Sequence, residues 1–488
     1  MKKLVSLLLA ALMISALFAV PVGSADDVVK LTWVQGTDAD APKDAALVGE
    51  ALNAISREKL GVEAEIVYMT NEQVNTSVMA AEVYDMYFTC DWYNDYATRA
   101  YGGVFADITD LVQTVTPDLY ATMPEEVWDL AKIQGKLYAV PVKKDYCPEI
   151  FLMFDISLFV DKLGMEIPAS MNVLDLEPFL QGFKSEYPDR YPLMFAKAGM
   201  NDGIFNYLYR QIGIGFPYSA AGTENATKII SVFEDEEMIA RWTAMHDWFG
   251  KGYVNPDAAT LDALGVPDKE NYIKIGQGFY GADAIWSENY QYPIAISKIS
   301  GPYLSTSGVQ GSMNAFNAAL EANPARLELA LKYQELVNTN LQYRDTLRYG
   351  IEGTHFNYNE DSTVTKTDLG VSNYNPWAFS QGSYALSSVS SSKFASVPAD
   401  PHMWDVVFAG YEDALVAADL GFAFDPTPVE MEIAQLIVIN EKWRPQLATG
   451  TVDPAEALPA VLAEMEAAGL REVIAEAQAQ LDAHLATK

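Results

Sequence analysis

Lys30-Leu-Thr-Trp-Val-Gln-Gly36 opens the part of the sequence that decides the fold, because it is typical of a strand that ends at a glycine. Apolar residues at helical spacing follow over 47–55 until Gly61 ends the predicted helix, and alternating apolar residues over 62–68 predict a second strand. A helical stretch over 72–81 then leads to a third predicted strand over 84–89. This order predicts right-handed crossovers and a mainly parallel sheet with helices on both faces.

The rest of the chain continues in the same α/β style. We predict strands over 136–140, 150–154 and 281–286, helices over 175–186, 203–212 and 235–251, and a strand followed by a helix over 312–338. The Ala- and Glu-rich end predicts two packed helices from residue 454, broken near Gly469. Because ligands bind at the carboxyl ends of parallel strands, residues 35–38 and 90–93 are expected on the functional rim.

Length and charge limit the classes of protein to which the chain belongs. A length of 488 residues predicts two or more globular units, and 66 acidic against 32 basic residues give a formal net charge of −34. This charge disfavours nucleic-acid partners and anionic membrane surfaces, since both are themselves negatively charged. With only two cysteines, Cys90 and Cys147, the chain is not a disulfide-rich miniprotein, and the sequence does not tell whether the two pair.

The first 25 residues are predicted to be a secretory signal peptide. Two lysines precede an apolar run over 4–20, and small residues follow over 21–25. Removal of this segment leaves 66 acidic and 30 basic residues, a net charge of −36. We therefore expect an exported protein, in the periplasm or at the extracellular face of the cell membrane. No cysteine stands at the cleavage point, so lipid anchoring is not expected.

Motifs for catalysis, cofactors and metals are weak in this sequence. The four histidines lie too far apart in sequence for metal-ligand spacing, and no Gly-x-Ser-x-Gly elbow occurs. Gly276-Gln-Gly-Phe-Tyr-Gly281 matches a dinucleotide fingerprint only by letter, since the acidic partner is missing, and it is interpreted as a turn. The aspartates between residues 38 and 44 are interpreted as a solvated acidic loop. We expect no cofactor, no metal and no catalytic residue.

Aromatic residues beside carboxylates or amides give a more specific indication. Three such groups occur: Asp91-Trp-Tyr93, Trp286-Ser-Glu-Asn-Tyr290 and Asn375-Pro-Trp377. A sugar offers an apolar ring face for stacking and a fringe of hydroxyls for hydrogen bonds, so this pairing of side chains matches its chemistry. The alternative is that each tryptophan is ordinary core packing.

The order of several segments resembles a known family. These segments are Tyr84-Asp-Met-Tyr-Phe-Thr-Cys-Asp-Trp92, Gly135-Lys-Leu-Tyr-Ala-Val-Pro141, Gly281-Ala-Asp-Ala-Ile-Trp286 and the strand and helix over 312–338. Together they resemble the extracellular solute-binding proteins of ABC importers, in the maltose-binding-like cluster. The segments 349–356 and 468–482 look like a subgroup with a distinctive C-terminal region that is linked to sugar or oligosaccharide uptake. The chain departs from many relatives in lacking the lipidation cysteine.

The resemblance implies an α/β fold of type II, in which two lobes with mainly parallel sheets close on a ligand about a hinge. The hinge crossings are expected near 142–146, 284–290 and 341–346, which gives an N-lobe of 27–143 plus 287–343 and a C-lobe of 144–286 plus 344–488. The implied function is non-enzymatic capture of a sugar or oligosaccharide, by a monomer that delivers it to the ABC permease subunits in the membrane. The alternatives are a peptide or other polar solute on the same scaffold, and a secreted glycan-active enzyme.

The predicted site combines three kinds of side chain. Tryptophans stack on sugar rings, carboxylates accept hydrogen bonds from hydroxyls, and amides add further polar contacts. The stacking residues are Trp92, Trp286 and Trp377, the carboxylates are Asp91, Glu288 and Glu352, and the amides are Gln35 and Asn289.

Overall fold

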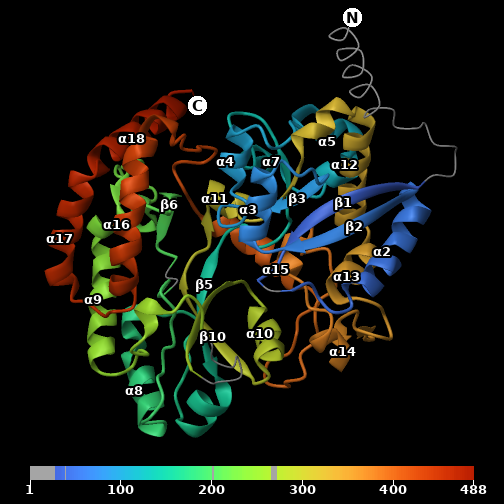
Figure 1. The fold of residues 1–488 in the computed structure, drawn as a ribbon. Helices are drawn as coiled ribbons and strands as arrows, with labels where there is room; N and C mark the ends of the chain where they lie inside the picture. Colours follow the sequence, from blue (N-terminus) through green and yellow to red (C-terminus); the bar gives the residue numbers. More distant parts are fainter. Residues whose placement is uncertain (1–27, 39, 201–202, 265–271, 488) are drawn as a thin grey trace, which may run out of the picture.

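The computed structural model describes residues 28–38, 40–200, 203–264 and 272–487, so the predicted signal peptide lies outside the described residues. The chain forms two α/β lobes, each built around its own sheet (Figure 1). Within the described ranges, no helix is both long and apolar enough to cross a membrane.

A five-stranded sheet forms the first lobe. Its strands lie in the order β2 (Val62–Met69), β1 (Val29–Gly36), β3 (Met86–Thr89), β12 (Met313–Phe316) and β4 (Ala139–Pro141). The predicted parallel pairing is found between β1 and its neighbours β2 and β3, whereas β12 runs antiparallel to β3 and β4. β1 and β2 remain in register up to the pair Gly36 and Met69, so both strands end at the same edge of the sheet.

Helices cover this sheet, and their ends follow local sequence signals. Gly61 ends α2 (Ala45–Leu60) in the left-handed conformation, with φ of 67°, and Thr70 begins α3 (Asn71–Met79) with a capping box. Pro324 begins α12 (Pro324–Thr339), as predicted. The other helices of this lobe are α4 (Tyr96–Tyr101), α5 (Thr109–Val115), α6 (Pro117–Tyr120), α7 (Glu125–Leu130), α11 (Thr306–Gln310) and α13 (Leu341–Tyr349).

The second lobe is built around a three-stranded sheet and a C-terminal helical layer. The strands lie in the order β10 (Ile294–Ser300), β5 (Glu149–Asp155) and β9 (Lys274–Gly278). The helices around it are α8 (Glu177–Glu186), α9 (Glu236–Gly250), α10 (Ala282–Tyr290) and α15 (Met403–Ala409). Figure 1 shows α9 beside the C-terminal helices α16 (Glu430–Ala448) and α17 (Pro454–Ala467), and α18 (Leu470–Leu485) packs on those two. Gly469, with φ of 96°, separates α17 from α18, as predicted.

Smaller elements complete the chain. A second three-stranded sheet consists of β6 (Phe205–Tyr209), β7 (Ile214–Pro217) and β8 (Ile230–Ser231). The remaining strands are β11 (Tyr303–Leu304) with β15 (Leu415–Val416) and β13 (Phe356–Tyr358) with β14 (Val364–Lys366), and the remaining α-helix is α14 (Asp368–Ser372).

Two predicted elements are wrong, and the sheet of the second lobe is antiparallel instead of mainly parallel. Residues 203–212 form β6 and the turn into β7 instead of a helix, because aromatic residues favour strands and Gly213 turns the chain with φ of 70°. Residues 282–286 belong to helix α10 instead of a strand. The end of β9, residues 276–278, overlaps the segment 276–281 interpreted as a turn. All pairings of the β10-β5-β9 sheet are antiparallel. The right-handed crossovers that the sequence predicted would have joined parallel strands, and this sheet has none among its pairings.

The lobe boundaries also differ from the predicted ones. The chain passes from the first sheet to the second over residues 142–148, close to the predicted crossing at 142–146. The return lies between β10 and β12 instead of at 284–290, because β10 pairs with β5. The predicted crossing at 341–346 lies inside α13, which packs in the first core together with Tyr374. The second segment of the first lobe therefore begins later than residue 287, after β10. It also continues beyond residue 343, since α13 and Tyr374 pack in the first core.

Candidate functional site

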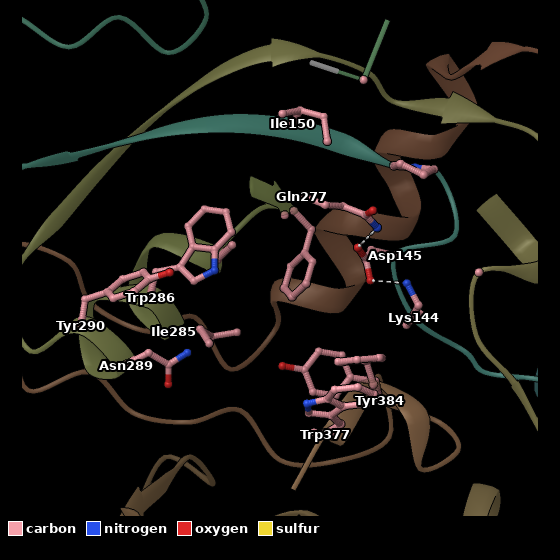
Figure 2. A pocket seen from close by; sticks show the side chains of 18 of the residues that line it. Lys144, Asp145, Ile150, Gln277, Ile285, Trp286, Asn289, Tyr290, Trp377 and Tyr384 are labelled. Carbon is pink, nitrogen blue, oxygen red and sulfur yellow. Dashed lines mark hydrogen bonds and ion pairs between the residues drawn. The ribbon is translucent and has the colours of Figure 1, made fainter. Parts of the chain in front are cut away.

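A cavity of about 1630 Å³ lies between the two lobes, with residues of both lobes in its lining. Figure 2 shows Trp286, Asn289 and Tyr290 from α10 on one side of this space and Trp377 and Tyr384 on another. The volume exceeds the ~300–1,000 Å³ that is typical of small-molecule pockets. The cavity therefore has room for a ligand of several linked rings.

Six of the eight predicted site residues line this cavity, and two do not. The six are Asp91, Trp92, Trp286, Glu288, Asn289 and Trp377. Asp91 and Trp92 directly follow β3, at the carboxyl end of a parallel strand, where the sequence placed the functional rim. The binding role of these six residues stays a prediction.

Gln35 and Glu352 have other positions. The Gln35 side chain is buried behind the cavity wall, where it donates to Asn314 Oδ1 at 3.3 Å and accepts from Ser380 Oγ at 2.7 Å. Ser380 Oγ also lies 2.7 Å from the Trp377 carbonyl oxygen, so Gln35 supports the segment that carries Trp377. Glu352 is exposed in a turn that bridges to Phe356, outside the cavity lining.

Trp377 is the centre of the aromatic wall contributed by the first lobe. Its ring centroid lies 5.6 Å from that of Trp92, with an interplanar angle of 62°, and 5.5 Å from that of Phe379, with the two rings nearly parallel at 24°. The ring packs against the end of β1 at Gly36, where a Cβ atom would lie only 2.5 Å from Trp377 Cζ3. A glycine at the end of β1 is therefore what allows the indole to lie at this position.

Trp286 occupies the equivalent place on the second lobe. It extends from α10 and lies over β9, where a Cβ atom on Gly278 would be 2.4 Å from its Cη2 atom. The edge of its ring also meets Phe151 of β5, at a centroid distance of 6.4 Å and an angle of 67°. Each lobe thus places one tryptophan against a glycine of its own sheet, and both indoles line the same cavity.

Three polar side chains are linked where the segment 142–148, which connects the two lobes, meets β9. Lys144 Nζ lies 3.2 Å from Asp145 Oδ1, and Asp145 Oδ2 accepts a hydrogen bond of 2.9 Å from Gln277 (Figure 2). Lys144 and Asp145 are only 8% and 7% exposed, so the ion pair is shielded from water. The contact fixes the crossing segment to the second lobe. These three residues were not predicted from the sequence, because only the fold brings them together.

Charged residues of the cavity wall were also missed. Arg210, Arg348, Lys366 and Arg444 line the cavity, and all lie near aromatic rings. The one available signal was composition, since basic residues are scarce in this chain and two of these four, Arg210 and Arg348, stand beside tyrosine in the sequence. The surrounding protein raises the pKa of the Asp91 carboxyl by desolvation, and the charge of Arg210 opposes this rise.

The two cysteines are both buried and free, which answers the question that the sequence left open. Burial raises the pKa of both thiols, so neither is an activated nucleophile. Among the described residues, no group of three or more His, Cys, Asp or Glu side chains is arranged to hold a metal ion.

The sequence and the structure were compared with known proteins. A family profile described as "Domain of unknown function (DUF3502)" matches residues 419–486, which span α16–α18. The crystal structure of the N-glycan transport solute binding protein NgtS from Streptococcus pneumoniae superposes with a TM-score of 0.81, at 22% identity, over 93% of this chain and 98% of that one. The fold is that of the two-lobed, type II solute-binding proteins.

Two further similarities agree with this fold. The same NgtS protein in complex with Man5GlcNAc superposes with a TM-score of 0.78, at 22% identity, over 94% of this chain and 99% of that one. A protein of Streptococcus pneumoniae serotype 4 named "Carbohydrate ABC transporter substrate-binding protein" is 24% identical over 451 residues, which cover 89% of this chain and 87% of that protein.

Proposed function

We propose that this protein is the extracellular substrate-binding component of an ABC importer, which captures a sugar or oligosaccharide between its two lobes. The observation that carries the proposal is the placement of Trp377 and Trp286, which line one cavity from opposite lobes, each against a glycine. Flat aromatic faces with carboxylates and amides nearby match the apolar faces and hydroxyl edges of sugar rings. The names of the similar proteins support the same class of ligand.

The cavity volume favours an oligosaccharide over a monosaccharide. A single sugar ring would fill only a small part of a space of about 1630 Å³, which exceeds the ~300–1,000 Å³ typical of small-molecule pockets. A ligand that reaches both tryptophans gains contacts in the closed arrangement that it lacks in the open one, and this differential affinity drives closure. The two chain crossings, over 142–148 and between β10 and β12, are the natural hinge segments.

The proposal extends to the cellular setting. The protein is exported, acts as a monomer in the periplasm or at the extracellular face of the membrane, and presents its closed form to two permease subunits. The ligand is released chemically unchanged. Mass spectrometry of the bound and released saccharide tests this last point, because a glycan-active enzyme would return shortened chains.

A thermal-shift screen of the purified protein tests the ligand class. The panel contains mono- and oligosaccharides, with peptides and amino acids as the comparison set. A ligand at 100 times its Kd adds about 2.7 kcal/mol to the free energy of unfolding, which raises Tm by a few degrees. Stabilisation by oligosaccharides supports the proposal. Stabilisation by peptides alone, or by neither set, contradicts it.

A further inference from the structure

The charge of the cavity lining is opposite in sign to that of the whole protein. Acidic residues outnumber basic ones by 66 to 32 in the sequence. In the lining the order is reversed, with six basic residues and four acidic ones. The basic ones are Lys144, Arg210, Arg348, Lys366, Lys393 and Arg444, and the acidic ones are Asp91, Asp145, Glu288 and Asp368. The basic residues that are scarce in the whole sequence are thus in the majority around this cavity.

Two of these cations share one aromatic ring. The guanidinium carbons of Arg210 and Arg444 lie 4.7 Å and 4.8 Å from the centroid of Tyr207, and Arg444 Nη2 donates to the Tyr207 hydroxyl at 2.7 Å. Arg444 comes from α16 and Arg210 from the turn after β6, so the fold brings them together across 234 residues. Within the described part of the chain, neither guanidinium forms an ion pair with a carboxylate within 4.0 Å.

A second pair of cations repeats this arrangement around Tyr349. Arg348 Cζ lies 4.6 Å and Lys366 Nζ 6.0 Å from its ring centroid. Arg348 is held by Ser387, and Lys366 donates to Asn375, but in the described ranges neither cation has an ion-pair partner. Desolvation and the charge of Arg348 lower the pKa of Lys366 to about 8, while Glu288 acts in the opposite direction.

Paired cations that no carboxylate contacts directly repel each other, and this repulsion is relieved when a negative group enters. A neutral sugar needs no such pair, since hydroxyls are satisfied by amides, carboxylates and aromatic faces. A guanidinium instead presents a planar fork that matches the oxygens of a carboxylate or a sulfate. The outer surface, with its large negative charge, repels anions, so acceptance of an anionic ligand requires local positive charge of this kind.

We propose that the ligand is an anionic oligosaccharide, whose carboxylate or sulfate group is held by Arg210 and Arg444 beside Tyr207, with the Arg348 and Lys366 pair attracting negative charge at a second point. This inference rests on the proposed function, because it names the substrate class of the same cavity. The rings of the oligosaccharide contact the tryptophans, and the acidic group determines which oligosaccharides enter.

Isothermal titration calorimetry with matched ligands tests the inference. Each acidic oligosaccharide is compared with a neutral counterpart: oligogalacturonides with their methyl esters, sialyllactose with lactose, and sulfated lactose with lactose. The acidic member of at least one pair should bind ~10-fold or more tightly than its neutral counterpart, and this preference should weaken as salt is raised. The uronate, sialyl and sulfate arms distinguish the source of the anionic group.

Variants connect the preference to the proposed residues. Arg210→Gln and Arg444→Gln should each weaken binding of the acidic ligand ~10-fold while changing that of the neutral one by about twofold or less. Arg210→Lys keeps the charge without the planar fork and should retain part of the preference. Arg57→Gln, an equal charge change on α2 outside the cavity lining, serves as the matched control and should leave both affinities unchanged.

The possible results separate the two proposals. Tight binding of neutral oligosaccharides with no gain from an acidic group overturns the inference and leaves the proposed function standing. A preference for acidic ligands that survives both Arg→Gln changes also overturns the inference, since the charge would act from elsewhere. Binding of no saccharide at all contradicts the proposed function and the inference together.

Discussion

The substitution Gly278→Ala should displace the indole of Trp286 without replacing that residue. The added Cβ atom would lie 2.4 Å from Trp286 Cη2 and 2.9 Å from Cζ2, whereas carbon atoms in contact prefer about 3.5–4.0 Å. The indole must therefore move by roughly 1 Å or more. Gly278 lies in strand β9 without a positive φ, so alanine fits the backbone and the effect comes from the clash alone.

The expected loss of affinity follows from the contact that the Trp286 indole makes with the ligand. Loss of a well-placed aromatic contact costs about 1 kcal/mol, or roughly fivefold in the Kd of the oligosaccharide that the screen identifies. Overpacking of this site should also lower the free energy of unfolding by ~1–3 kcal/mol. Calorimetric titration measures the first effect, and denaturant unfolding measures the second.

Gly276→Ala is the matched control, since it makes the same change two residues earlier in the same strand. Its Cβ atom would meet the flexible end of Met153 at 2.8 Å and Trp286 Cζ2 at an ordinary 3.9 Å, so the affinity should change little. In a Trp286→Ala background, Gly278→Ala should have no further effect on affinity. Equal affinities of the two glycine variants, or an undiminished effect of Gly278→Ala without the indole, would refute the reasoning.

Three further predictions follow from the same structure. Gly36→Ala, whose Cβ atom would lie 2.5 Å from Trp377 Cζ3, should weaken oligosaccharide binding by about fivefold in calorimetry; unchanged affinity would remove Trp377 from the contact surface. Asp145→Ala should lower the free energy of unfolding by about 3 kcal/mol in urea titrations, because it leaves the buried ammonium of Lys144 without its partner, and a loss below 1 kcal/mol would contradict a shielded pair. Lys366 has a folded-state pKa of about 8, below the 10.5 of an ordinary lysine, so the folded protein binds fewer protons than the unfolded chain between these values. The free energy of unfolding of the wild type relative to Lys366→Gln should therefore rise by at most about 3 kcal/mol from pH 8 to pH 10.5, and a flat difference would show that the ammonium is not desolvated.

The sequence predicted the fold well where local signals decide the structure. Gly61 ends a helix, Pro324 begins one and Gly469 separates two, and all three positions were predicted because glycine and proline restrict the backbone by themselves. The segment 203–212 was mistaken because a short aromatic run fits both a helix and a strand. Its conformation is decided by pairing with β7, a contact that periodicity does not reveal.

The candidate site was predicted in part, for a similar reason. Asp91 and Trp92 follow a strand of the parallel set, and the rule for strand ends was enough to place them at the cavity. Gln35 also stands at a strand end, but Asn314 and Ser380, about 280 and 345 residues away in sequence, occupy its amide group. Arg444 likewise reaches Tyr207 across 237 residues, so no local pattern predicted that it would join Arg210 at this ring.

The most direct test of the account is calorimetric titration of one oligosaccharide into the wild type, Trp286→Ala and Trp377→Ala. The two tryptophans lie on different lobes, so a ligand held between the lobes should lose at least ~1 kcal/mol of binding free energy in each variant. Loss in both variants is the predicted result. Wild-type affinity in both would contradict the claim that an oligosaccharide is bound between these two faces.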